Sequence, residues 1–361
     1  MDEIIAFPIA ALTTACVVYI LHPLAPRLGL LDQPGARRKI HAHAVAPIGG
    51  IAIFAGLLAG LLVLLTYTPP NAKEGFGLLG AAVLVIVGGL DDRFDLGYRA
   101  RLLAQAVAAL LLVLGAGAEL HGLGDLFGYG PVGLGWLSVP FTVIAIVGLI
   151  NAFNMIDGID GLAGSLALIA LVSLLLVAPE QQAAHLTQIQ LLAIVTLLPY
   201  LAFNLELPGF RKHKIFLGDA GSMLIGYLVV WSLIETSQAS QQGLPPVVAL
   251  WLAAIPLMDT FAVMGRRIRK GRSPFKADHH HLHHLLTRTT GSPRKTLVIM
   301  LSIGLVMALW ALITTAMGIP EYVLFYQALL VFGGYLMVQA KIPQLYRSLR
   351  RRRSNKQRGV F

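Results

Sequence analysis

The sequence predicts an all-α polytopic membrane protein, and three observations support this fold class. The mean hydropathy is +0.73, only 13% of the 361 residues are charged, and long apolar runs recur along the chain. Soluble domains are about 25% charged and lack apolar runs of about 20 residues. The basic residues do not interleave with aromatic residues as nucleic-acid-binding patches do, so we expect no nucleic-acid partner. The one cysteine, Cys16, excludes an intramolecular disulfide.

About eleven apolar runs are long enough to cross a hydrocarbon core about 30 Å thick as helices. The first run follows two acidic residues and lacks a small-residue cleavage site, so we expect a membrane span and not a signal peptide. We expect one integral-membrane domain over residues 1–345, followed by a basic cytoplasmic tail at 346–361. The predicted spans begin near residues 4, 47, 76, 99, 134, 161, 187, 219, 245, 295 and 321.

The distribution of Lys and Arg predicts the orientation of these spans. With eleven spans, 27 of the 28 basic residues fall in loops on one side and only Lys73 falls on the other. Basic loops stay cytoplasmic, so we expect a periplasmic N-terminus, a cytoplasmic C-terminus and five cytoplasmic loops. The acidic residues on the cytoplasmic side gather in tight groups, whereas those outside are scattered singly. We therefore expect the active site at the cytoplasmic face.

The segment VGGLDDRFDLGYRARLL carries the first acidic group. In a helix, Asp92 and Asp95 would share a face, with Asp91 beside them. Three neighbouring carboxylates repel one another, so either a bound ligand or nearby salt bridges must offset their charge. A metal, phosphate or proton site is favoured over a solvated loop. The basic residues available in the segment are Arg93, Arg99 and Arg101.

Two further segments combine carboxylates with glycines. In NAFNMIDGIDG a helix cap would explain one polar side chain, but four are present, and their oxygens suit a polar ligand or a hydrated Mg²⁺. In KIFLGDAGSM, Asp219 lies in a glycine turn that opens a predicted span, where free backbone N–H groups favour an anion. Taken alone, that turn fits an ordinary helix start equally well. The polar side chains of the first segment are Asn151, Asn154, Asp157 and Asp160.

The segment GRRIRKGRSPFKADHHHLHHLL holds five of the 11 histidines beside a run of Lys and Arg. So much positive charge repels a metal ion and attracts a polyanion such as a nucleotide diphosphate. Phosphate binding is therefore favoured over a transition-metal site or a solvated interfacial loop. Asp259, just upstream, is a candidate because it is an intramembrane-edge carboxylate, although pairing with a basic neighbour such as Arg266 also explains it.

Carboxylates that hold Mg²⁺, together with cationic anion binders, are the parts that phosphoryl transfer requires. Their location at a membrane surface implies that one substrate is a lipid. A reaction between a soluble nucleotide-activated donor and a membrane phosphate would fit.

Four motifs in order, GGLDDRFDLG, NAFNMIDGIDGLAG, FLGDAGS and HLHH, resemble the signatures of the polyprenyl-phosphate N-acetylhexosamine-1-phosphate transferases. The resemblance extends from residues 30–50 to the His cluster at 279–284. It implies a multi-pass protein of the bacterial inner membrane that transfers GlcNAc-1-phosphate from UDP-GlcNAc to undecaprenyl phosphate, the first step of O-antigen or related glycan synthesis. It also implies Mg²⁺ as cofactor, with Mn²⁺ as a substitute, and a homodimer. His279 and His280 have no counterpart with an assigned role.

The same resemblance assigns roles to individual residues. Asp91 and Asp92 match paired aspartates implicated in catalysis and in positioning metal or lipid phosphate. Asp157 and Asp160 belong to the nucleotide-side motif and are also assigned to catalysis. Asp219 matches the principal Mg²⁺ ligand, with Asp92 as a second. The substrate-binding residues predicted in this way are Lys39, Asn151, Asn154, Asn204, Arg266, His281, His283 and His284.

Several alternatives stay open at the level of the sequence. The donor sugar could be GalNAc, QuiNAc or FucNAc, and the reaction could pass through a covalent aspartyl-phosphate instead of one in-line step. From other classes, a cation-coupled transporter predicts carboxylates in mid-span and a repeat between the halves of the chain, and neither is present. A lipid-binding scaffold would need neither Asp219 nor the asparagines.

Overall fold

A computed structural model describes residues 2–32, 44–67, 71–177, 184–238, 244–273 and 281–358. Within these ranges the chain is helical and contains no β-strand, only three isolated bridges. The predicted all-α class is confirmed for this part of the chain. The helices are α1 (Ala6–Leu28), α2 (Gly49–Leu64), α3 (Ala72–Phe94), α4 (Tyr98–Leu110), α5 (Ser138–Ile156), α6 (Leu162–Leu176), α7 (Ala184–Asn204), α8 (Gly218–Gln238), α9 (Val248–Leu252), α10 (Ala254–Arg269), α11 (Leu282–Thr290), α12 (Pro293–Ala316) and α13 (Glu321–Arg358).

Eight helical segments among the described residues are long and apolar enough to cross a bilayer. Two more apolar helices, α2 and α6, are shorter, and the predicted span near residue 245 is divided into α9 and α10 at Ala253. A helix begins close to each of the eleven predicted starts. The polytopic architecture is therefore supported, while the number of spans and their orientation stay predictions.

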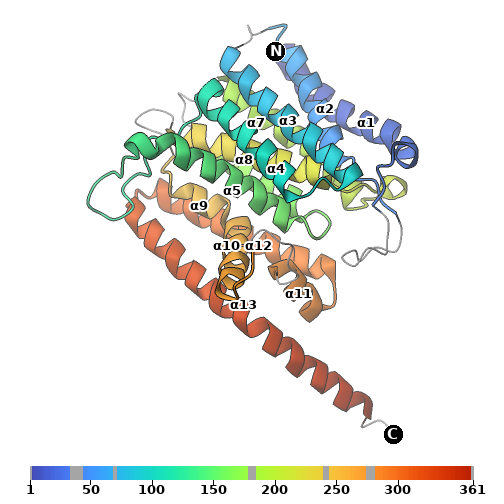
Figure 1. Cartoon of the computed structure of the whole chain (residues 1–361), viewed down its shortest axis with the longest axis vertical. Helices are drawn as coiled ribbons and strands as arrows, with labels where there is room; N and C mark the ends of the chain where they lie inside the picture. The colour runs from blue at the N-terminus through green and yellow to red at the C-terminus, as the bar shows by residue number, and fades with distance from the viewer. Residues whose placement is uncertain are drawn as a thin grey trace.

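Helix α8 is the most enclosed of the candidate spans, because 89% of the residues in its apolar stretch are buried inside the protein. Helices α2, α3, α5 and α6 pack around it, and Figure 1 shows it in the middle of the bundle. A helix that is apolar on all sides belongs in such a position, because no face of it needs water. The polar first turn of α8 is thereby held inside the bundle.

The first turn of α8 is in backbone contact with two neighbouring helices. A Cβ added to Gly50 of α2 would overlap Gly221, and one added to Gly88 of α3 would overlap Ala220 and come within 2.8 Å of the Asp219 carbonyl carbon. Glycine permits this approach because it has no side chain. The close packing fixes the start of α8 against α2 and α3.

Two short segments that precede α2 and α8 run side by side. The Phe216 N–H donates to the Ala46 carbonyl at 2.9 Å, and the Gly49 and Gly50 N–H groups donate to Phe216 and Leu217 at 2.9 and 3.0 Å. The first N–H groups of a helix have no partner within the helix. Here the segment leading into α8 satisfies those of α2, so the two helix starts are tied together.

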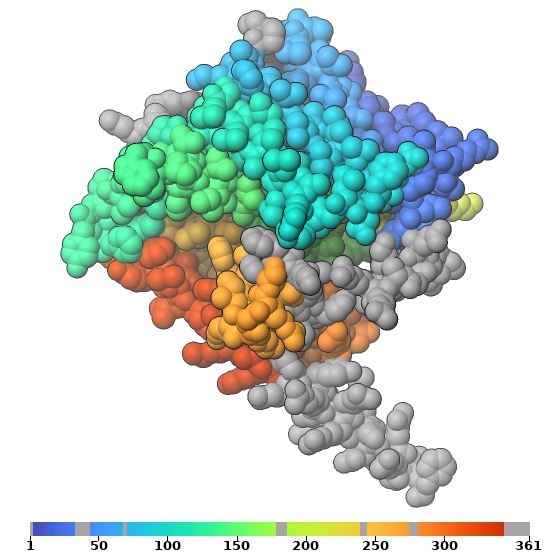
Figure 2. Space-filling model, viewed as in Figure 1, coloured from blue at the N-terminus to red at the C-terminus, as the bar shows by residue number. Residues whose placement is uncertain are grey.

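The C-terminal helices form a second layer. Figure 2 shows them, in orange and red, covering the lower face of the bundle beneath the cyan and green helices α4 and α5. Helix α13 continues past the bundle to Arg358, so the predicted basic tail begins within a continuous helix (Figure 1). The proposed division at residue 346 stays a prediction.

Replacing Gly88 by Ala should destabilise the fold, because the new methyl group would meet backbone atoms of α8 that cannot move aside. Overpacking of this kind costs about 1–3 kcal/mol. Gly89→Ala in the same helix is the matched control, since its nearest neighbour would be Ile51 Cδ1 at 3.9 Å. In thermal unfolding of the detergent-solubilised proteins, equal midpoints for the two variants would contradict the close contact.

Candidate active site

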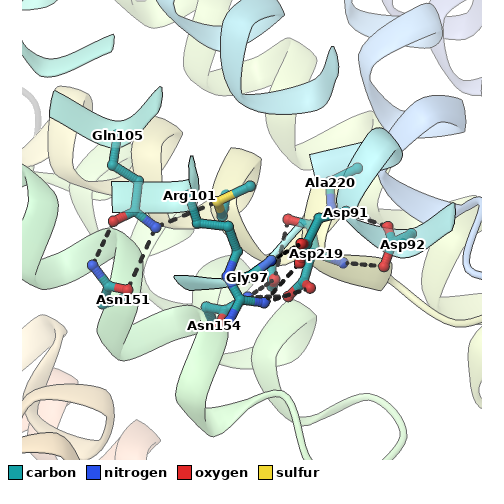
Figure 3. Close-up of polar contacts among 11 residues, drawn as sticks. Asp91, Asp92, Gly97, Arg101, Gln105, Asn151, Asn154, Asp219 and Ala220 are labelled. Atoms are coloured by element: carbon teal, nitrogen blue, oxygen red, sulfur yellow. Dashed lines mark hydrogen bonds and ion pairs between the residues drawn. The ribbon is translucent and has the colours of Figure 1, made fainter. Parts of the chain in front are cut away.

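Three carboxylates meet at the junction of α3, α4 and α8. One Arg101 guanidinium nitrogen lies 2.9 Å from Asp91 Oδ2 and 2.7 Å from Asp219 Oδ2, so a single cation bridges the two acids (Figure 3). The Asp91 side chain is 3% exposed, whereas those of Arg101 and Asp219 are 29% and 26% exposed. The predicted charge compensation is therefore confirmed, and Arg101 is the arginine that provides it. A patch of this cluster remains open to solvent.

Asp92 has a different role from its neighbour Asp91. Its carboxylate accepts the N–H of Asp219 at 2.9 Å and that of Ala220 at 3.3 Å, so it caps the N-terminus of α8 from a separate helix. A Cβ on Gly218 would lie 2.5 Å from Asp92 Oδ2, so glycine is needed there for the carboxylate to approach. In this arrangement both oxygens of Asp92 are engaged by backbone donors.

The predicted shared face of Asp92 and Asp95 is wrong. Helix α3 ends at Phe94, and Asp95 adopts a left-handed conformation with φ of 51°. The chain turns there into α4, which allows the Gly97 N–H to donate to Asp91 Oδ1 at 3.2 Å. The turn thus brings Arg101, on the next helix, back over Asp91.

One of the two asparagines of α5 enters the same network (Figure 3). Asn154 Nδ2 donates to Asp219 Oδ1 at 2.6 Å and to Ser222 Oγ at 2.8 Å, which orients the Asp219 carboxylate. Asn151 instead bonds Gln105 of α4, with its Nδ2 2.5 Å from Gln105 Oε1. Asn154 is thus in direct contact with the acidic cluster, and Asn151 is one helical turn removed from it.

Residues 157–161 form the connection between α5 and α6, so Asp157 and Asp160 do not share a helix face. Asp160 Oδ2 pairs with Lys214 Nζ at 2.8 Å, and the same amine lies 2.8 Å from Glu206 Oε1. Burial alone would lower the pKa of Lys214, but the hydrogen bonds to Asp160 and Glu206 outweigh it and raise that pKa. Burial, and then the charges of Asp219 and Asp160, raise the pKa of Asp157 to about 7.

Asn204 connects this loop to the start of α8. Its Oδ1 accepts the Gly161 N–H at 2.6 Å, and its Nδ2 donates to the Ile215 carbonyl at 2.8 Å. The side chain is 2% exposed, so both bonds are made inside the protein. Asn204 therefore fixes the loop at 157–161 relative to the turn that carries Asp219, and this geometry gives it a structural role.

The described histidines of the cluster occupy three environments at the start of α11. His281 Nδ1 lies 2.7 Å from Asp259 Oδ2 of α10. His283 is 1% exposed, and neither of its ring nitrogens has a hydrogen-bond partner. Burial, and then the neighbouring His284, lower the pKa of His283 to about 3, so its ring is neutral at physiological pH. His284 is half-buried beside it, with ring centroids 4.1 Å apart.

Helix α11 contacts the 157–161 loop directly. A Cβ on Gly158 would overlap His283 Nε2 and would lie 2.7 Å from its Cδ2 atom. The glycine of the loop and the buried imidazole are therefore in van der Waals contact. This contact connects the histidine segment to the acidic part of the site.

Two predicted substrate-binding residues remain, Lys39 and Arg266. Lys39 lies outside the described residues, as do His279 and His280. Arg266 lies in the last turn of α10, on the helix that carries Asp259. Substrate contact by either predicted residue stays a prediction.

Three features of the site were missed by the interpretation of the sequence. Lys214 was counted only as a topology signal, and the pairing of Asp259 with His281 spans 22 residues. The packing of Gly158 on His283 joins two motifs far apart in the chain. Of these features, only the pairing of Asp259 with His281 had a signal in the sequence, namely a carboxylate within a predicted span upstream of a histidine segment.

The donor chemistry of the cluster fits a divalent cation. Asp91 and Asp219 present carboxylate oxygens, the hard donors that Mg²⁺ takes, to a single positive charge. Asn154 supports this arrangement by donating its amide N–H to Asp219. In the described part of the chain, no three His, Cys, Asp or Glu side chains are already arranged to hold a metal. Arg101 supplies the positive charge in this arrangement, and it is Asp91 that shares this charge with Asp219.

Comparison with known proteins covers nearly the whole chain. The model of glycosyl transferase family 4 matches residues 76–237. The undecaprenyl-phosphate alpha-N-acetylglucosaminyl 1-phosphate transferase of Salmonella typhi is 37% identical over 353 residues, 96% of this chain and 95% of that protein. The proteins of the same name from Escherichia coli (strain K12) and Pasteurella multocida (strain Pm70) are each 35% identical, covering 94% of this chain and 93% and 94% of their own lengths. The resemblance carried by the four motifs is confirmed, and the chain belongs to glycosyl transferase family 4, the polyprenyl-phosphate N-acetylhexosamine-1-phosphate transferases.

Proposed function

We propose that this protein transfers GlcNAc-1-phosphate from UDP-GlcNAc to undecaprenyl phosphate, giving GlcNAc-diphospho-undecaprenol and UMP. The observation that carries the proposal is the partly exposed Asp91–Arg101–Asp219 cluster at the ends of apolar helices. Relatives that cover almost the whole chain bear the name of this activity. A transporter is disfavoured because these acids lie in the last turn of α3 and the first turn of α8, not in mid-span.

We propose a one-step mechanism for this transfer. A lipid phosphate oxygen attacks the β-phosphorus of UDP-GlcNAc in line, the bond from that phosphorus to the bridging oxygen breaks, and UMP leaves. A phosphate monoester has a second pKa of about 6, so the nucleophile is mostly dianionic at neutral pH and needs little help from a base. Asp91 would orient this phosphate or take its residual proton, and the covalent aspartyl-phosphate route remains the alternative.

Asp219 and Asp91 are the residues that would hold Mg²⁺, or Mn²⁺ in its place. The metal would offset the negative charge that accumulates on the donor diphosphate. Asn154 would keep the Asp219 carboxylate oriented, and Asp92 would keep the turn bearing Asp219 fixed through its backbone bonds. The assignment of Asp92 as a metal ligand is retained only as the weaker alternative, because its oxygens accept backbone N–H groups at the start of α8, whereas Asp91 and Asp219 share a side-chain cation that a metal could replace.

We also propose that the site faces the cytoplasm of a multi-pass bacterial inner-membrane protein. Eleven spans with a periplasmic N-terminus would leave 27 of the 28 Lys and Arg residues on the cytoplasmic side. The C-terminal end of α3, the start of α8 and the α5–α6 connection would then lie on that side together, as their contacts require. A homodimer is retained as an expectation from the family.

Release of UMP by the purified protein tests the proposed reaction. We expect UMP to appear only when UDP-GlcNAc, undecaprenyl phosphate and Mg²⁺ are all present, since the lipid phosphate is the nucleophile. Parallel assays with UDP-GalNAc, UDP-QuiNAc and UDP-FucNAc identify the donor. Folded protein that releases no UMP from any of these donors would refute the assignment, and release without lipid would favour the covalent route.

Replacing Arg101 by Gln should strengthen metal binding in the absence of substrates. The guanidinium occupies the space between Asp91 and Asp219, so a cation must displace it. A hydrogen bond to a charged group contributes about 1.5–3 kcal/mol, so we expect Mn²⁺ affinity to rise by about tenfold or more. Electron paramagnetic resonance of free and bound Mn²⁺ measures this directly.

Arg99→Gln is the matched control for that measurement. Arg99 lies on the same helix but is exposed, and within the described ranges its side chain hydrogen-bonds only the adjacent Tyr98 hydroxyl, at 3.4 Å. Its Mn²⁺ affinity should equal that of the unsubstituted protein. Weaker Mn²⁺ binding by Arg101→Gln would show instead that the arginine organises the carboxylates for the metal.

Replacing Gly158 by Ala should impair turnover by displacing α11. The new methyl group would overlap the buried His283 ring, which has no open space to enter. A displacement of about 1 Å in a reacting site can cost on the order of 100-fold in rate. Gly148→Ala in α5, with no atom within 4 Å of its Cβ, should leave kcat unchanged. Similar kcat values for both variants would disprove the proposed link between loop and histidines.

A further inference from the structure

Asp259 is a buried carboxylate on which three separate elements converge. It lies on α10 and is 1% exposed. Its Oδ2 contacts His281 Nδ1 at 2.7 Å, and its Oδ1 accepts the Leu282 N–H and the Tyr335 hydroxyl, each at 2.8 Å. The carboxylate thus joins α10 to the start of α11 and to the middle of α13. The Leu282 N–H and the Tyr335 hydroxyl are the donors in two of these contacts.

These contacts leave only one arrangement for the His281 ring. The carboxylate accepts hydrogen bonds, so the proton on this side of the ring must be on Nδ1. The opposite nitrogen, Nε2, has no hydrogen-bond partner among the described residues. A neutral ring held in this way presents an unprotonated Nε2, and a protonated ring presents an Nε2–H donor whose charge the carboxylate balances.

The other two described histidines of the HLHH motif, His283 and His284, are held differently from His281. His283 is enclosed against Gly158 with a pKa lowered to about 3, chiefly by burial. The His284 ring is edge-on to that of His281, with centroids 6.4 Å apart. Among the described histidines of this segment, His281 is the one whose Nδ1 faces the Asp259 carboxylate at hydrogen-bonding distance.

We propose that Asp259 is a positioning residue: its carboxylate accepts the His281 Nδ1–H, fixes the orientation of the ring and balances the charge of the ring protonated on both nitrogens, so that the Nε2–H donates to a phosphate oxygen of the donor. The inference rests on the proposed function, because it takes the ligand of His281 to be the nucleotide diphosphate. A carboxylate behind a functional imidazole commonly has this role, whether the ring binds a metal or transfers a proton. Tyr335 and the Leu282 N–H hold the carboxylate itself in place.

Asp259→Asn tests the inference with little change in volume. The two donors at Oδ1 would retain the amide oxygen, so the amide NH₂ would face His281 Nδ1 and leave the ring with a proton on Nε2 alone. We expect kcat to fall by about 10- to 100-fold, the range seen when such partners of functional histidines are removed. The KM for UDP-GlcNAc should change less, because the loss is in orientation during turnover.

A double-substitution cycle separates positioning from general support of the fold. If Asp259 acts through His281, Asp259→Asn should cost less than about twofold in a His281→Asn background. Tyr335→Phe serves as the matched variant, since it removes one donor to the same carboxylate but leaves Oδ2 facing Nδ1. An equal loss from Asp259→Asn in both backgrounds would overturn the proposal.

Nitrogen-15 NMR of histidine-labelled protein gives a readout that does not depend on activity. The His281 signals, identified by their loss in His281→Asn, should show protons on both ring nitrogens in the unsubstituted protein and in Tyr335→Phe. In Asp259→Asn they should show a proton on Nε2 alone, and an unchanged pattern would refute the inference. Absence of UMP release by the unsubstituted protein would refute the proposed function instead, whatever the protonation of the ring.

Discussion

The site depends on how the N-terminus of α8 is satisfied inside the bundle. A helix start leaves N–H groups without partners, and burying them unpaired is costly. Asp92 supplies the acceptors from α3, and Gly50 and Gly88 allow the backbones to approach closely enough for the bond to form. Once α3 and α8 are joined in this way, the neighbouring Asp91 must face Asp219. The acidic cluster of Asp91 and Asp219 is therefore a consequence of the capping of α8 by Asp92.

Two cations make that concentration of acid tolerable. Arg101 bridges Asp91 and Asp219, and Lys214 bridges Asp160 and Glu206. Without them the carboxylates would repel one another in a region of low dielectric, where the interaction is stronger than in water. Asp157 has no such cationic partner among the described residues, and burial, followed by the charges of Asp219 and Asp160, raises its pKa to about 7. Arg101 and Lys214 thus place positive charge at the positions where a bound metal and a donor diphosphate would interact with these carboxylates.

Hydropathy predicted where the long apolar helices begin, because apolar length is set by the membrane and not by tertiary contacts. It did not predict the short helix α11 or the break between α9 and α10 at Ala253. The motifs also predicted which segments meet, but not what each side chain does there. Asp91 and Asp92 are adjacent in an acidic pair, yet one faces Arg101 and the other caps α8, since successive helical residues point about 100° apart. Likewise Arg101, and not the exposed Arg99, compensates the acids because α4 turns that face toward α8. Such choices follow from packing, which spacing alone does not determine.

The side chains of the histidine motif also differ in their roles, although they lie within four residues of one another. Its positive flank suggested a uniform anion-binding cluster, but burial separates the rings: one is fixed by Asp259, one is enclosed and neutral, and one lies half-buried beside them. A neutral ring with no hydrogen-bond partner contributes packing, and His283 fills the space that Gly158 leaves. The enclosed ring then sets the distance between α11 and the acidic loop, while Asp259 sets the direction in which His281 points. Distance and direction are thus controlled by different residues, so a motif of similar side chains can place one nitrogen accurately at the site.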